Sequence, residues 1–399
     1  MKKKPVVLVF IPNYLPGYRA GGPIRSLVNM VARLGDELDF RIITRDRDLN
    51  DDEAYPGIIR GEWIVVGKAK VMYLRQASIS VNYLSELVHQ LSPDVIYLNS
   101  YFNSIFTQRI LWARKLKKIH DIPIVLAPRG EFSSGALGLN KLKKSIYLNV
   151  VRILGIYDDI VWHASSDIEA ADIISGTNHV KISQIKVALN LAPVEPGLEL
   201  VRAQHIAGKP LRVCFLSRIS PKKNLDFSLR VLTKVEVPVV YTIYGPKEDK
   251  NYWRECELLL DALPPHVTVE YGGIIVPDRV KSVLLNHDLF FFPTLGENYG
   301  HVIHEALCAG LPVLLSDQTP WDAVNDSGVG WTLPLTAPMS FVSVIEDVAG
   351  WSNEALNNVS NLAQKFANDC AIDTDVEKAN LDLFMQAVNT TNKELSFEE

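Results

Sequence analysis

Short runs of consecutive apolar residues recur along the chain, separated by longer stretches in which polar and apolar residues mix. Runs of Val, Ile, Leu and Phe without clean alternation are typical of parallel strands, which are covered on both faces. The strands that these runs predict are 6–11, 40–44, 94–98, 123–127 and 160–163 in the first half of the chain, and 211–217, 239–244, 267–271, 289–292 and 312–315 in the second half.

Helical patterns fall between these runs, so strands and helices alternate along the chain. The predicted helices include 24–34, 80–91, 104–119, 225–235, 278–286 and 300–309. This alternation predicts an α/β fold with two Rossmann-like domains, whose parallel sheets face each other across a cleft.

Prolines and glycines gather in the stretch 191–210, which is the best candidate for a linker between the domains. The predicted N-terminal domain is 1–195, and the predicted C-terminal domain is 205–375. With 399 residues, of which 47% are hydrophobic, the chain can bury two separate cores.

The four cysteines are scattered without paired spacing. This indicates a reducing compartment, and neither a disulfide framework nor a zinc site. The apolar run at the N-terminus is too short for a signal peptide, because Pro12 and Asn13 end it. No stretch reaches the roughly 18–20 apolar residues that span a bilayer. We therefore expect a cytoplasmic protein, soluble or peripheral on the cytoplasmic face of the inner membrane.

The net charge of −5 is distributed unevenly along the chain. Residues 1–190 carry a net charge of +7, and residues 191–399 carry −12. Such a difference suggests a separate partner for each half, although unequal but solvated surfaces explain it equally well.

Two glutamates, Glu297 and Glu305, flank the junction between a predicted strand and the helix that follows it. The strand ends at Pro293, and Gly310 with Pro312 ends the helix. Glu297 therefore lies at the carboxyl edge of a parallel sheet, where α/β proteins hold phosphorylated ligands on helix N–H groups. Carboxylates there would repel phosphate, so we expect them to accept hydrogen bonds from sugar hydroxyls. A nucleotide-sugar carries both kinds of group.

A plainer explanation is that Glu297 caps the helix and Glu305 is a solvated helix residue. However, the segment resembles the signature of retaining glycosyltransferases of family 4. The resemblance rests on the glutamate pair, on Gly-Glu-Asn-Tyr-Gly at 296–300, on Glu305-Ala306 and on Gly310-Leu-Pro-Val313. The next segment, 316–321, resembles the bacterial surface-polysaccharide branch of that family.

The resemblance implies the GT-B fold, with an acceptor-side N-terminal domain and a C-terminal domain that binds the nucleotide-sugar donor. The C-terminal helix of such enzymes commonly crosses back onto the first domain, which we expect of residues 376–399. By resemblance, Glu305 binds the nucleotide ribose, and Glu297 binds sugar hydroxyls near the reacting carbon. The other donor-binding residues that it implies are Asn298, Tyr299, Gly300 and, through their backbone, Gly273 and Ile274.

Cations follow the predicted strand 211–217, at Arg218, Lys222 and Lys223. An arginine can bind two oxygens of a diphosphate at once, and a lysine adds a point charge. A solvated surface loop would contain the same residue types. By resemblance, Arg218 and Lys223 correspond to the pair that holds the donor pyrophosphate and takes part in catalysis.

Glycines follow the first predicted strand, in the segment from Gly17 to Arg25. Adjacent glycines let backbone approach a ligand closely, although their spacing is not that of a dinucleotide site. Pro23 suits the first position of a helix, so a tight helix entry is the alternative explanation. By resemblance this loop borders the donor phosphates and the acceptor, with Gly22 on the donor side and Arg25 on the acceptor side.

Three further residues are candidates for the acceptor side: Arg129, Glu131 and His163. Many family members have a histidine where Arg129 and Gly130 stand here, and the Arg-Gly-Glu version recurs in the polysaccharide branch. A single histidine such as His163 is more often structural than catalytic. His304-Glu305 lacks the second histidine of a zinc-binding HExxH pattern, so we expect no metal hydrolysis.

The segment 137–157 mixes apolar and basic residues at helical spacing, and a second basic cluster lies at 114–118. Together they could contact an anionic membrane and admit a lipid-linked acceptor. The alternative is an amphipathic helix that packs on its own core.

These residues and the resemblance predict a retaining glycosyltransferase that moves a hexose-type sugar from a nucleotide-diphosphate sugar to a growing surface glycan. No side chain is placed to act as a nucleophile. We expect Arg218, Lys223 and helix N–H groups to stabilise the departing diphosphate. They would substitute for a metal ion, so neither a metal nor another cofactor is expected.

Other functions stay open at this point. A nucleotide-sugar epimerase or a phosphorylase shares the fold, and a non-catalytic subunit would bind a nucleotide-sugar or a glycan without turnover. Nucleic-acid binding is not expected, because the sequence pI is about 6.0 and basic and aromatic residues do not interleave as in known modules.

Overall fold

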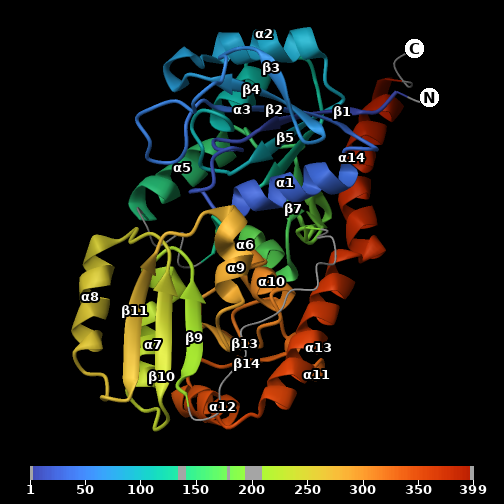
Figure 1. Ribbon diagram of the computed structural model, residues 1–399. Helices are drawn as coiled ribbons and strands as arrows, with labels where there is room; N and C mark the ends of the chain where they lie inside the picture. Colours follow the sequence, from blue (N-terminus) through green and yellow to red (C-terminus); the bar gives the residue numbers. More distant parts are fainter. Residues whose placement is uncertain (1–2, 134–140, 178–179, 194–208, 396–399) are drawn as a thin grey trace. The chain divides into compact units, whose positions relative to one another are not determined.

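The computed structural model describes residues 3–133, 141–177, 180–193 and 209–395 (Figure 1). The chain divides into two compact units. Unit 1 comprises Met1–Pro193 and Asp373–Glu399, and unit 2 comprises Val194–Ile372. Most of the predicted linker, residues 194–208, lies outside the described residues. Within the described ranges, no helix has the length and apolar character needed to cross a membrane.

Unit 1 is built on a sheet of eight strands in the order β3-β4-β2-β1-β5-β6-β7-β8. Neighbouring strands are parallel except for β3 and β4, which form an antiparallel pair. The strands are β1 (Val6–Phe10), β2 (Asp39–Arg45), β3 (Trp63–Val66), β4 (Ala69–Leu74), β5 (Val95–Asn99), β6 (Ile124–Ala127), β7 (Val161–Ala164) and β8 (Ile185–Val187).

Helices cover both faces of this sheet. They are α1 (Gly22–Leu34), η1 (Gln76–Ser78), α2 (Val81–Leu91), α3 (Gln108–Lys115), α5 (Lys141–Ile153), α6 (Asp167–Thr177), η2 (Ile182–Gln184) and α14 (Thr374–Leu395). Successive residues of a strand point to opposite faces. Leu8 and Phe10 of β1 therefore pack into the core shared with α2, α3 and α5, whereas Val7 and Val9 pack into the core shared with α1 and α14.

Helix α14 returns the chain to unit 1 after unit 2 is complete (Figure 1). The ring of Phe384 packs edge-on against Phe40 and Tyr97, with ring centroids 6.1 and 5.2 Å apart. The side-chain amide of Asn380 donates a hydrogen bond of 2.8 Å to the carbonyl oxygen of Leu189. Part of one apolar face of the unit 1 sheet is thus covered by residues that follow unit 2 in the chain, and α1 covers the rest of that core.

Unit 2 is built on a six-stranded sheet in the order β11-β10-β9-β12-β13-β14. Every neighbouring pair in it is parallel. The strands are β9 (Leu211–Leu216), β10 (Val239–Tyr244), β11 (Val267–Gly273), β12 (Leu289–Phe292), β13 (Val313–Ser316) and β14 (Gly330–Leu333).

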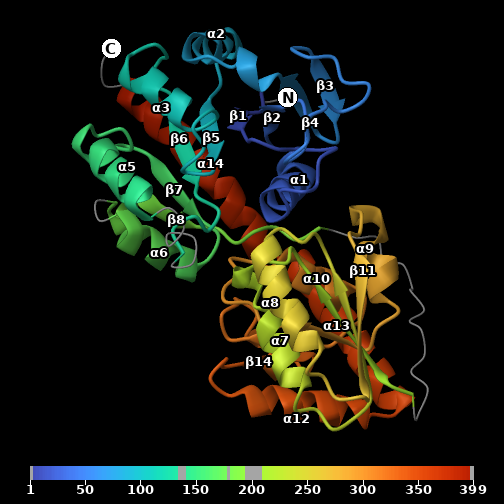
Figure 2. The same cartoon turned by 90° about the vertical axis from the view of Figure 1, so that its left-hand side faces the viewer.

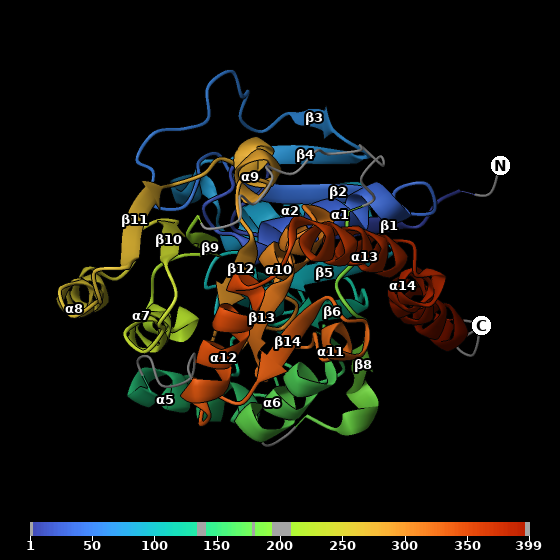
Figure 3. The same ribbon diagram turned by 60° about the horizontal axis from the view of Figure 1, so that its bottom comes forward.

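Helices of unit 2 form two groups, one on each face of its sheet (Figures 2 and 3). They are η3 (Pro221–Lys223), α7 (Leu225–Leu232), α8 (Lys250–Leu260), α9 (Pro277–Leu284), α10 (His301–Cys308), α11 (Ala323–Asp326), α12 (Pro338–Ala349) and α13 (Asn353–Ala371). Helix α7 packs against α8, whereas α10 packs against α9 and α13. One contiguous apolar core joins these helices to the strands.

The predicted strands are confirmed, because continuous apolar runs are what a sheet covered on both faces requires. The predicted helix 104–119 is wrong at both ends, since α3 is shorter. Asn103 Oδ1 accepts hydrogen bonds from the backbone N–H groups of Ile105 and Phe106, at 3.1 and 2.7 Å, and forms a turn before the helix. Lys117, with φ +53°, adopts a left-handed conformation just beyond its end.

Each sheet contains one point where the strand order changes direction. In unit 1 this point lies between β1 and β5, and in unit 2 it lies between β9 and β12. Open α/β sheets bind ligands at the carboxyl ends of the strands beside such a point. The loops after β1, β5, β9 and β12 are therefore where functional side chains are expected.

Candidate functional site

Lys223 and Glu297 form an ion pair at the switch point of unit 2. Lys223 ends η3, after β9, and Glu297 lies in the loop after β12. Their side chains are only 11% and 14% exposed. The Lys223 ammonium also lies 5.5 Å from the ring centroid of Phe292. A largely buried ammonium paired with a carboxylate can exchange that partner for the phosphate oxygens of a ligand.

Two hydrogen bonds to backbone carbonyl groups join the two loops that carry this ion pair. The N–H of Leu295 donates to the carbonyl oxygen of Lys222 at 2.9 Å. The side-chain amide of Asn224 donates to the carbonyl oxygen of Pro293, also at 2.9 Å. Asn224 has φ +58°, a left-handed conformation that asparagine tolerates better than most residues. The loops therefore form one support for the ion pair.

Arg218 lies in the loop after β9 and forms an ion pair with Glu248, with 2.8 Å between Nη1 and Oε1. Both side chains are about two-fifths exposed, at 42% and 41%. The adjacent Lys247 is held between two rings, with its Nζ 3.9 Å from the Trp253 centroid and 4.3 Å from the Tyr271 centroid. These cation–π contacts fix the loop after β10, which supplies the partner of Arg218.

Gly245 lets the loops after β9 and β10 approach each other. It has φ +129°, and a Cβ at this position would lie 1.8 Å from the carbonyl oxygen of Ser217. Beyond this contact, the N–H of Ile219 donates to the carbonyl oxygen of Pro246 at 2.9 Å. Arg218 is thus positioned by a backbone contact that only glycine permits.

Besides Glu297, the loop before α10 contains three more of the predicted donor-binding residues. Gly300 is the N-cap of the helix in a left-handed conformation. Tyr299 packs on Trp321, with ring centroids 5.3 Å apart, and the indole N–H of Trp321 donates to the carbonyl oxygen of Tyr299. Burial raises the pKa of the Tyr299 hydroxyl above its ordinary value. Asn298 is half-buried beside them.

The other predicted donor residues of unit 2 lie on, or directly after, two separate elements, α10 and β11. Glu305 is half-buried, more than one turn into α10. Gly273 ends β11, and Ile274 follows it with 59% of its surface exposed. Gly273 and Ile274 lie at the carboxyl edge of the sheet, and Glu305 lies in the helix that follows β12. Open α/β sheets bind ligands at this edge.

Gly22 and Arg25 lie in unit 1, at the start of α1. Pro23 occupies the first turn of the helix, so the tight helix entry considered from the sequence is present. A Cβ at Gly22 would meet no atom within 4 Å. Packing within the protein therefore does not require a glycine there, and the backbone is open to a ligand.

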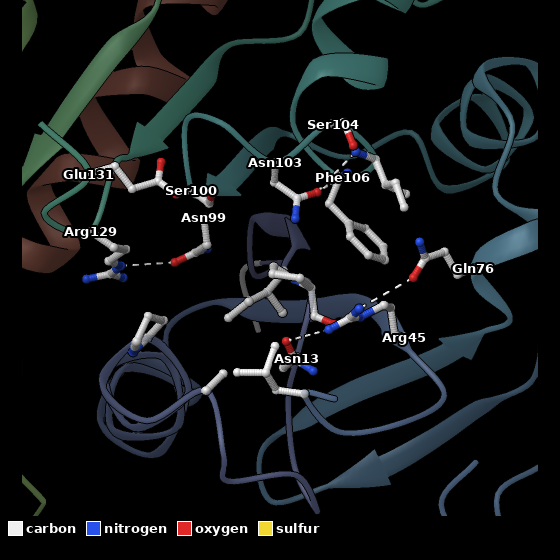
Figure 4. Close-up of a pocket in the computed structure, with 16 residues that line it drawn as sticks. Asn13, Arg45, Gln76, Asn99, Ser100, Asn103, Ser104, Phe106, Arg129 and Glu131 are labelled. Carbon is white, nitrogen blue, oxygen red and sulfur yellow. Dashed lines mark hydrogen bonds between the residues drawn. The ribbon is translucent and has the colours of Figure 1, made fainter. Parts of the chain in front are cut away.

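A pocket of about 450 Å³ lies at the switch point of unit 1, between loops that follow β1, β2, β5 and β6 (Figure 4). Arg129 and Glu131, two of the predicted acceptor-side residues, line it. The guanidinium of Arg129 donates to Asn99 Oδ1 at 3.1 Å, to Asn190 Oδ1 at 2.7 Å and to the Tyr97 hydroxyl at 2.7 Å.

The carboxylate of Glu131 organises the loop after β5. It accepts hydrogen bonds from Ser100 Oγ at 2.6 Å and from the N–H groups of Tyr101 and Phe102 at 2.5 and 3.0 Å. Burial raises the pKa of the Glu131 carboxyl, and these donors act in the opposite direction. Most of its acceptor capacity is therefore used within the protein.

The expectation that His163 contacts an acceptor is not supported by its position. The residue lies inside β7 and is 1% exposed. Its Nδ1 is 2.8 Å from the Tyr97 hydroxyl, and its Nε2 is 2.8 Å from the carbonyl oxygen of Ala188. With both ring nitrogens engaged inside the sheet, His163 is a structural residue. It contacts Tyr97, which in turn contacts Arg129.

His163 should make unit 1 sensitive to acid. Burial, followed by the charge of Arg129, lowers its pKa from 6.5 to about 3. Between these values the unfolded chain binds a proton that the folded protein does not, so acidification favours unfolding by up to about 1.4 kcal/mol per pH unit. His163→Gln should flatten the fall of the unfolding free energy, measured by urea titration from pH 6 downward. The same change at exposed His120 is the control, and equal slopes for both variants would contradict this role.

Three polar residues that shape these regions were not predicted from the sequence: Arg45, Asn99 and Glu248. Asn99 and Arg45 are the last residues of β5 and β2, so a polar residue at the end of a predicted strand was a usable signal. The sequence offers no comparable signal for Glu248, because its role depends on how the loop after β10 folds.

Comparison with solved structures places both units in one known architecture. HepE (Alr3699) of Anabaena, solved in complex with UDP and glucose, is 15% identical, and the match covers 97% of this chain and 99% of that protein with a TM-score of 0.66. WaaG, a glycosyltransferase involved in lipopolysaccharide biosynthesis, is 13% identical over 96% of this chain and 99% of its own, with a TM-score of 0.63. Identities this low carry information on the fold alone. The fold is GT-B, as predicted.

A family model accounts for most of unit 2. Residues 199–365 match Glycosyl transferases group 1. The group 1 segment contains Arg218, Lys223, Glu297 and Glu305, together with the other donor-side candidates of unit 2. The pocket of unit 1 lies outside it.

A curated relative extends the comparison to sequence outside this segment. It is an uncharacterized 41.2 kDa protein in the cps region of Klebsiella pneumoniae, 24% identical over 241 residues. The match spans 59% of this chain and 63% of the length of that relative.

Proposed function

We propose that the protein is a retaining glycosyltransferase that transfers a sugar from a nucleotide-diphosphate sugar to a glycan acceptor, lipid-linked, in the synthesis of a bacterial surface polysaccharide. The observation that carries this proposal is the position of Arg218, Lys223 and Glu297 on joined loops at the switch point of unit 2, within the group 1 segment. The complexes of HepE with UDP and with UDP-glucose favour a nucleotide-diphosphate donor. The relative in the cps region and WaaG favour a surface glycan as the product.

The chemistry that we propose relies on electrostatics. The bond between the anomeric carbon and the diphosphate oxygen breaks, and the acceptor hydroxyl bonds to that carbon on the same face. The hydroxyl proton passes to a diphosphate oxygen. Negative charge accumulates on the departing diphosphate, where Arg218 and Lys223 can neutralise it. Glu297 then accepts hydrogen bonds from sugar hydroxyls near the reacting carbon.

Both cations have carboxylate partners that the donor would replace. The Arg218–Glu248 pair is half-exposed, so its exchange for a diphosphate costs little desolvation. The Lys223–Glu297 pair is more deeply buried, so exchange there requires phosphate oxygens in nearly the same place as the Glu297 carboxylate. In this proposal Glu305 binds the ribose, N–H groups at the start of α10 face the diphosphate, and no metal is required.

The donor site can be tested by thermal shift with a panel of UDP-, GDP-, ADP- and TDP-sugars in the presence of EDTA. A ligand that binds only the folded state raises the melting temperature in a concentration-dependent way. We expect a shift with one nucleotide class, lost in Glu305→Gln. The absence of a shift with every donor would contradict the proposal. A shift that appears only when EDTA is omitted would also contradict it.

Product analysis separates the transferase from other functions of the fold. A transferase releases nucleoside diphosphate in an acceptor-dependent way and joins the sugar to the acceptor with its anomeric configuration unchanged. An epimerase releases nucleotide and an altered free sugar without any acceptor. A binding subunit shows the thermal shift without turnover.

We further propose that unit 1 contacts anionic lipid through α3 and the C-terminal part of α5. Arg114 of α3 donates a hydrogen bond of 3.0 Å to the carbonyl oxygen of Asp158, in the segment that follows α5. Apolar side chains that packing would normally bury are exposed here, beside exposed cations, which is the composition of an interfacial surface. The exposed apolar residues are Trp112, Leu116, Ile146, Val150, Ile153 and Leu154, and the exposed cations include Lys115, Lys117, Lys118 and Arg152.

Vesicle binding tests this surface. Lys115→Glu combined with Arg152→Glu should abolish sedimentation with vesicles of phosphatidylcholine and phosphatidylglycerol, since each cation contributes about 1 kcal/mol near an anionic surface. Lys186→Glu combined with Lys234→Glu, also at exposed positions, makes the same change of charge elsewhere. Equal binding by the two double variants would contradict this role. The predicted segment 137–157 also contains Lys141 and Lys143, whose side chains lie outside the described residues.

A further inference from the structure

The pocket of unit 1 contains a cation without a counter-ion. Arg45, at the end of β2, has its guanidinium in the pocket (Figure 4). It donates to the carbonyl oxygen of Pro12 at 2.9 Å, to Asn13 Oδ1 at 2.8 Å and, weakly, to Gln76 Oε1 at 3.4 Å. All three acceptors are neutral. Within the part of the chain that the structure describes, Arg45 forms no ion pair.

Partial burial makes this arrangement costly. Desolvation lowers the pKa of the Arg45 guanidinium below its ordinary value, although the group stays charged. A charge taken partly out of water is normally paired. Asp46 and Asp48, which follow the strand, raise the pKa of Arg45 through their charge, but neither forms an ion pair with it in the described structure. Asp46 pairs with Arg47 and Arg60, and Asp48 accepts hydrogen bonds from backbone N–H groups.

Asn99 supplies a hydrogen-bond donor without a partner in the same pocket. It is 1% exposed and lines the cavity (Figure 4). Its Oδ1 accepts the hydrogen bond from Arg129, which sets the orientation of the amide. Its Nδ2 is buried and has no hydrogen-bond partner. Leaving a buried donor unpaired is unfavourable, so such donors are rare in folded proteins and point to a ligand that satisfies them.

The side chains that line the pocket carry a net positive charge. Among the described residues that line the pocket, the ionised groups are the guanidiniums of Arg45 and Arg129 and the carboxylate of Glu131. The hydrogen bonds of Arg129 that the structure describes go to neutral groups, and those of Glu131 come from neutral donors. The net charge of +1 therefore remains available to a ligand, in the half of the chain that carries +7.

We propose that this pocket binds an anionic group of the acceptor, a sugar carboxylate or phosphate, through Arg45 and the Nδ2 of Asn99. An arginine binds both oxygens of such a group in a fork, and the amide N–H completes the site. The acceptor end that the pocket selects is thus an acidic or phosphorylated sugar. That the ligand is the acceptor rests on the proposed transferase function. The binding of the anion itself does not depend on that function.

Gln76→Glu is the sharpest test, because it supplies the missing counter-ion without removing Arg45. Gln76 is exposed on η1, and its Oε1 already faces Arg45 Nη1, so an isosteric carboxylate there would compete with the ligand. Arg45→Gln is less suitable, since it removes hydrogen bonds that hold the loop after β1. Gln90→Glu, at an exposed position of α2, makes the identical substitution away from the pocket.

The probes are D-glucuronate, glucose 6-phosphate and neutral D-glucose, added to the full chain and followed by calorimetry or ligand-observed NMR. We expect one or both charged sugars to bind and glucose not to bind. The charged sugar that binds more tightly shows whether the pocket prefers a carboxylate or a phosphate. Gln76→Glu should weaken the binding by about tenfold or more, and Gln90→Glu should leave it unchanged. Charged sugars that bind no better than glucose would overturn the proposal, as would equal weakening by the two variants.

The donor panel separates this proposal from the proposed function. If charged sugars bind and no nucleotide-sugar does, the anion site stands and the transferase assignment fails. If nucleotide-sugars bind and charged sugars do not, the pocket assignment fails alone. In a transfer assay, Gln76→Glu should raise KM for a charged acceptor and leave KM for the donor unchanged.

Discussion

Lys223→Met is expected to lower the rate of sugar transfer by about 10²–10³-fold, the loss that follows removal of one preorganised group that stabilises developing charge. Lys223 is the most buried cation at the switch point of unit 2, so its charge is weakly screened by solvent. The leaving diphosphate gains charge as the glycosidic bond breaks, and the ammonium would act mainly at that stage. We therefore expect kcat to fall more than the affinity for the donor, measured under saturating acceptor.

The same substitution removes the partner of Glu297, and a loss of stability must be separated from a loss of catalysis. A largely buried carboxylate without its partner destabilises a protein by roughly 3–5 kcal/mol. Lys223→Met combined with Glu297→Gln removes both charges and should recover much of the melting temperature. It should not recover transfer. A double variant that regains activity along with stability would show that Lys223 serves only the fold.

Gly245→Ala is expected to lower the free energy of unfolding by more than about 3 kcal/mol, because it combines two unfavourable effects. The new Cβ would lie 1.8 Å from the carbonyl oxygen of Ser217, and backbone cannot yield as a flexible side chain does. The φ of +129° is also unfavourable for alanine. If the protein still folds, the loop after β9 must move, and Arg218 must move with it. Urea unfolding and donor binding together measure the two consequences.

Gly328→Ala is the matched control for this prediction. Gly328 belongs to the same unit and has φ +66°, but a Cβ there would meet nothing within 4 Å. Its substitution carries the conformational cost alone, which is about 1–2 kcal/mol for a left-handed residue. Equal losses of stability in the two variants would show that the contact with Ser217 contributes nothing.

The sequence predicted the sheets well because their strands are buried on both faces. A run such as Leu289–Phe292 is apolar throughout, which is typical of a strand in a parallel sheet covered on both sides. The antiparallel pair Trp63–Val66 and Ala69–Leu74 was not predicted, since β3 is half-exposed and lacks that signature. The end of the predicted helix 104–119 failed for a different reason. The left-handed turn at Lys117 is made by a residue type that rarely adopts it.

Side-chain pairing was harder to predict than position. The sequence placed Lys223 and Glu297 at the ends of neighbouring strands, but their mutual ion pair depends on how two loops fold together. His163 shows the opposite difficulty. Its place at the end of a predicted strand suggested a side chain that contacts a ligand. Instead, its ring is buried and forms a hydrogen bond with the Tyr97 hydroxyl. One residue of register decides between these outcomes, and an apolar run does not specify register to that accuracy.

The return of α14 to unit 1 has a consequence for biosynthesis. During translation the ribosome releases Phe40 and Tyr97 long before Phe384, the residue that packs on both of them. The intervening chain includes all of unit 2, which forms its own core without any part of α14. Until the second unit has emerged, the nascent N-terminal unit therefore lacks the cover that α14 provides, and of the described helices only α1 packs on that face of its sheet. A gene fragment that stops after Pro193 would leave the part of the face that α14 covers permanently exposed, and we expect it to be captured by chaperones or to aggregate.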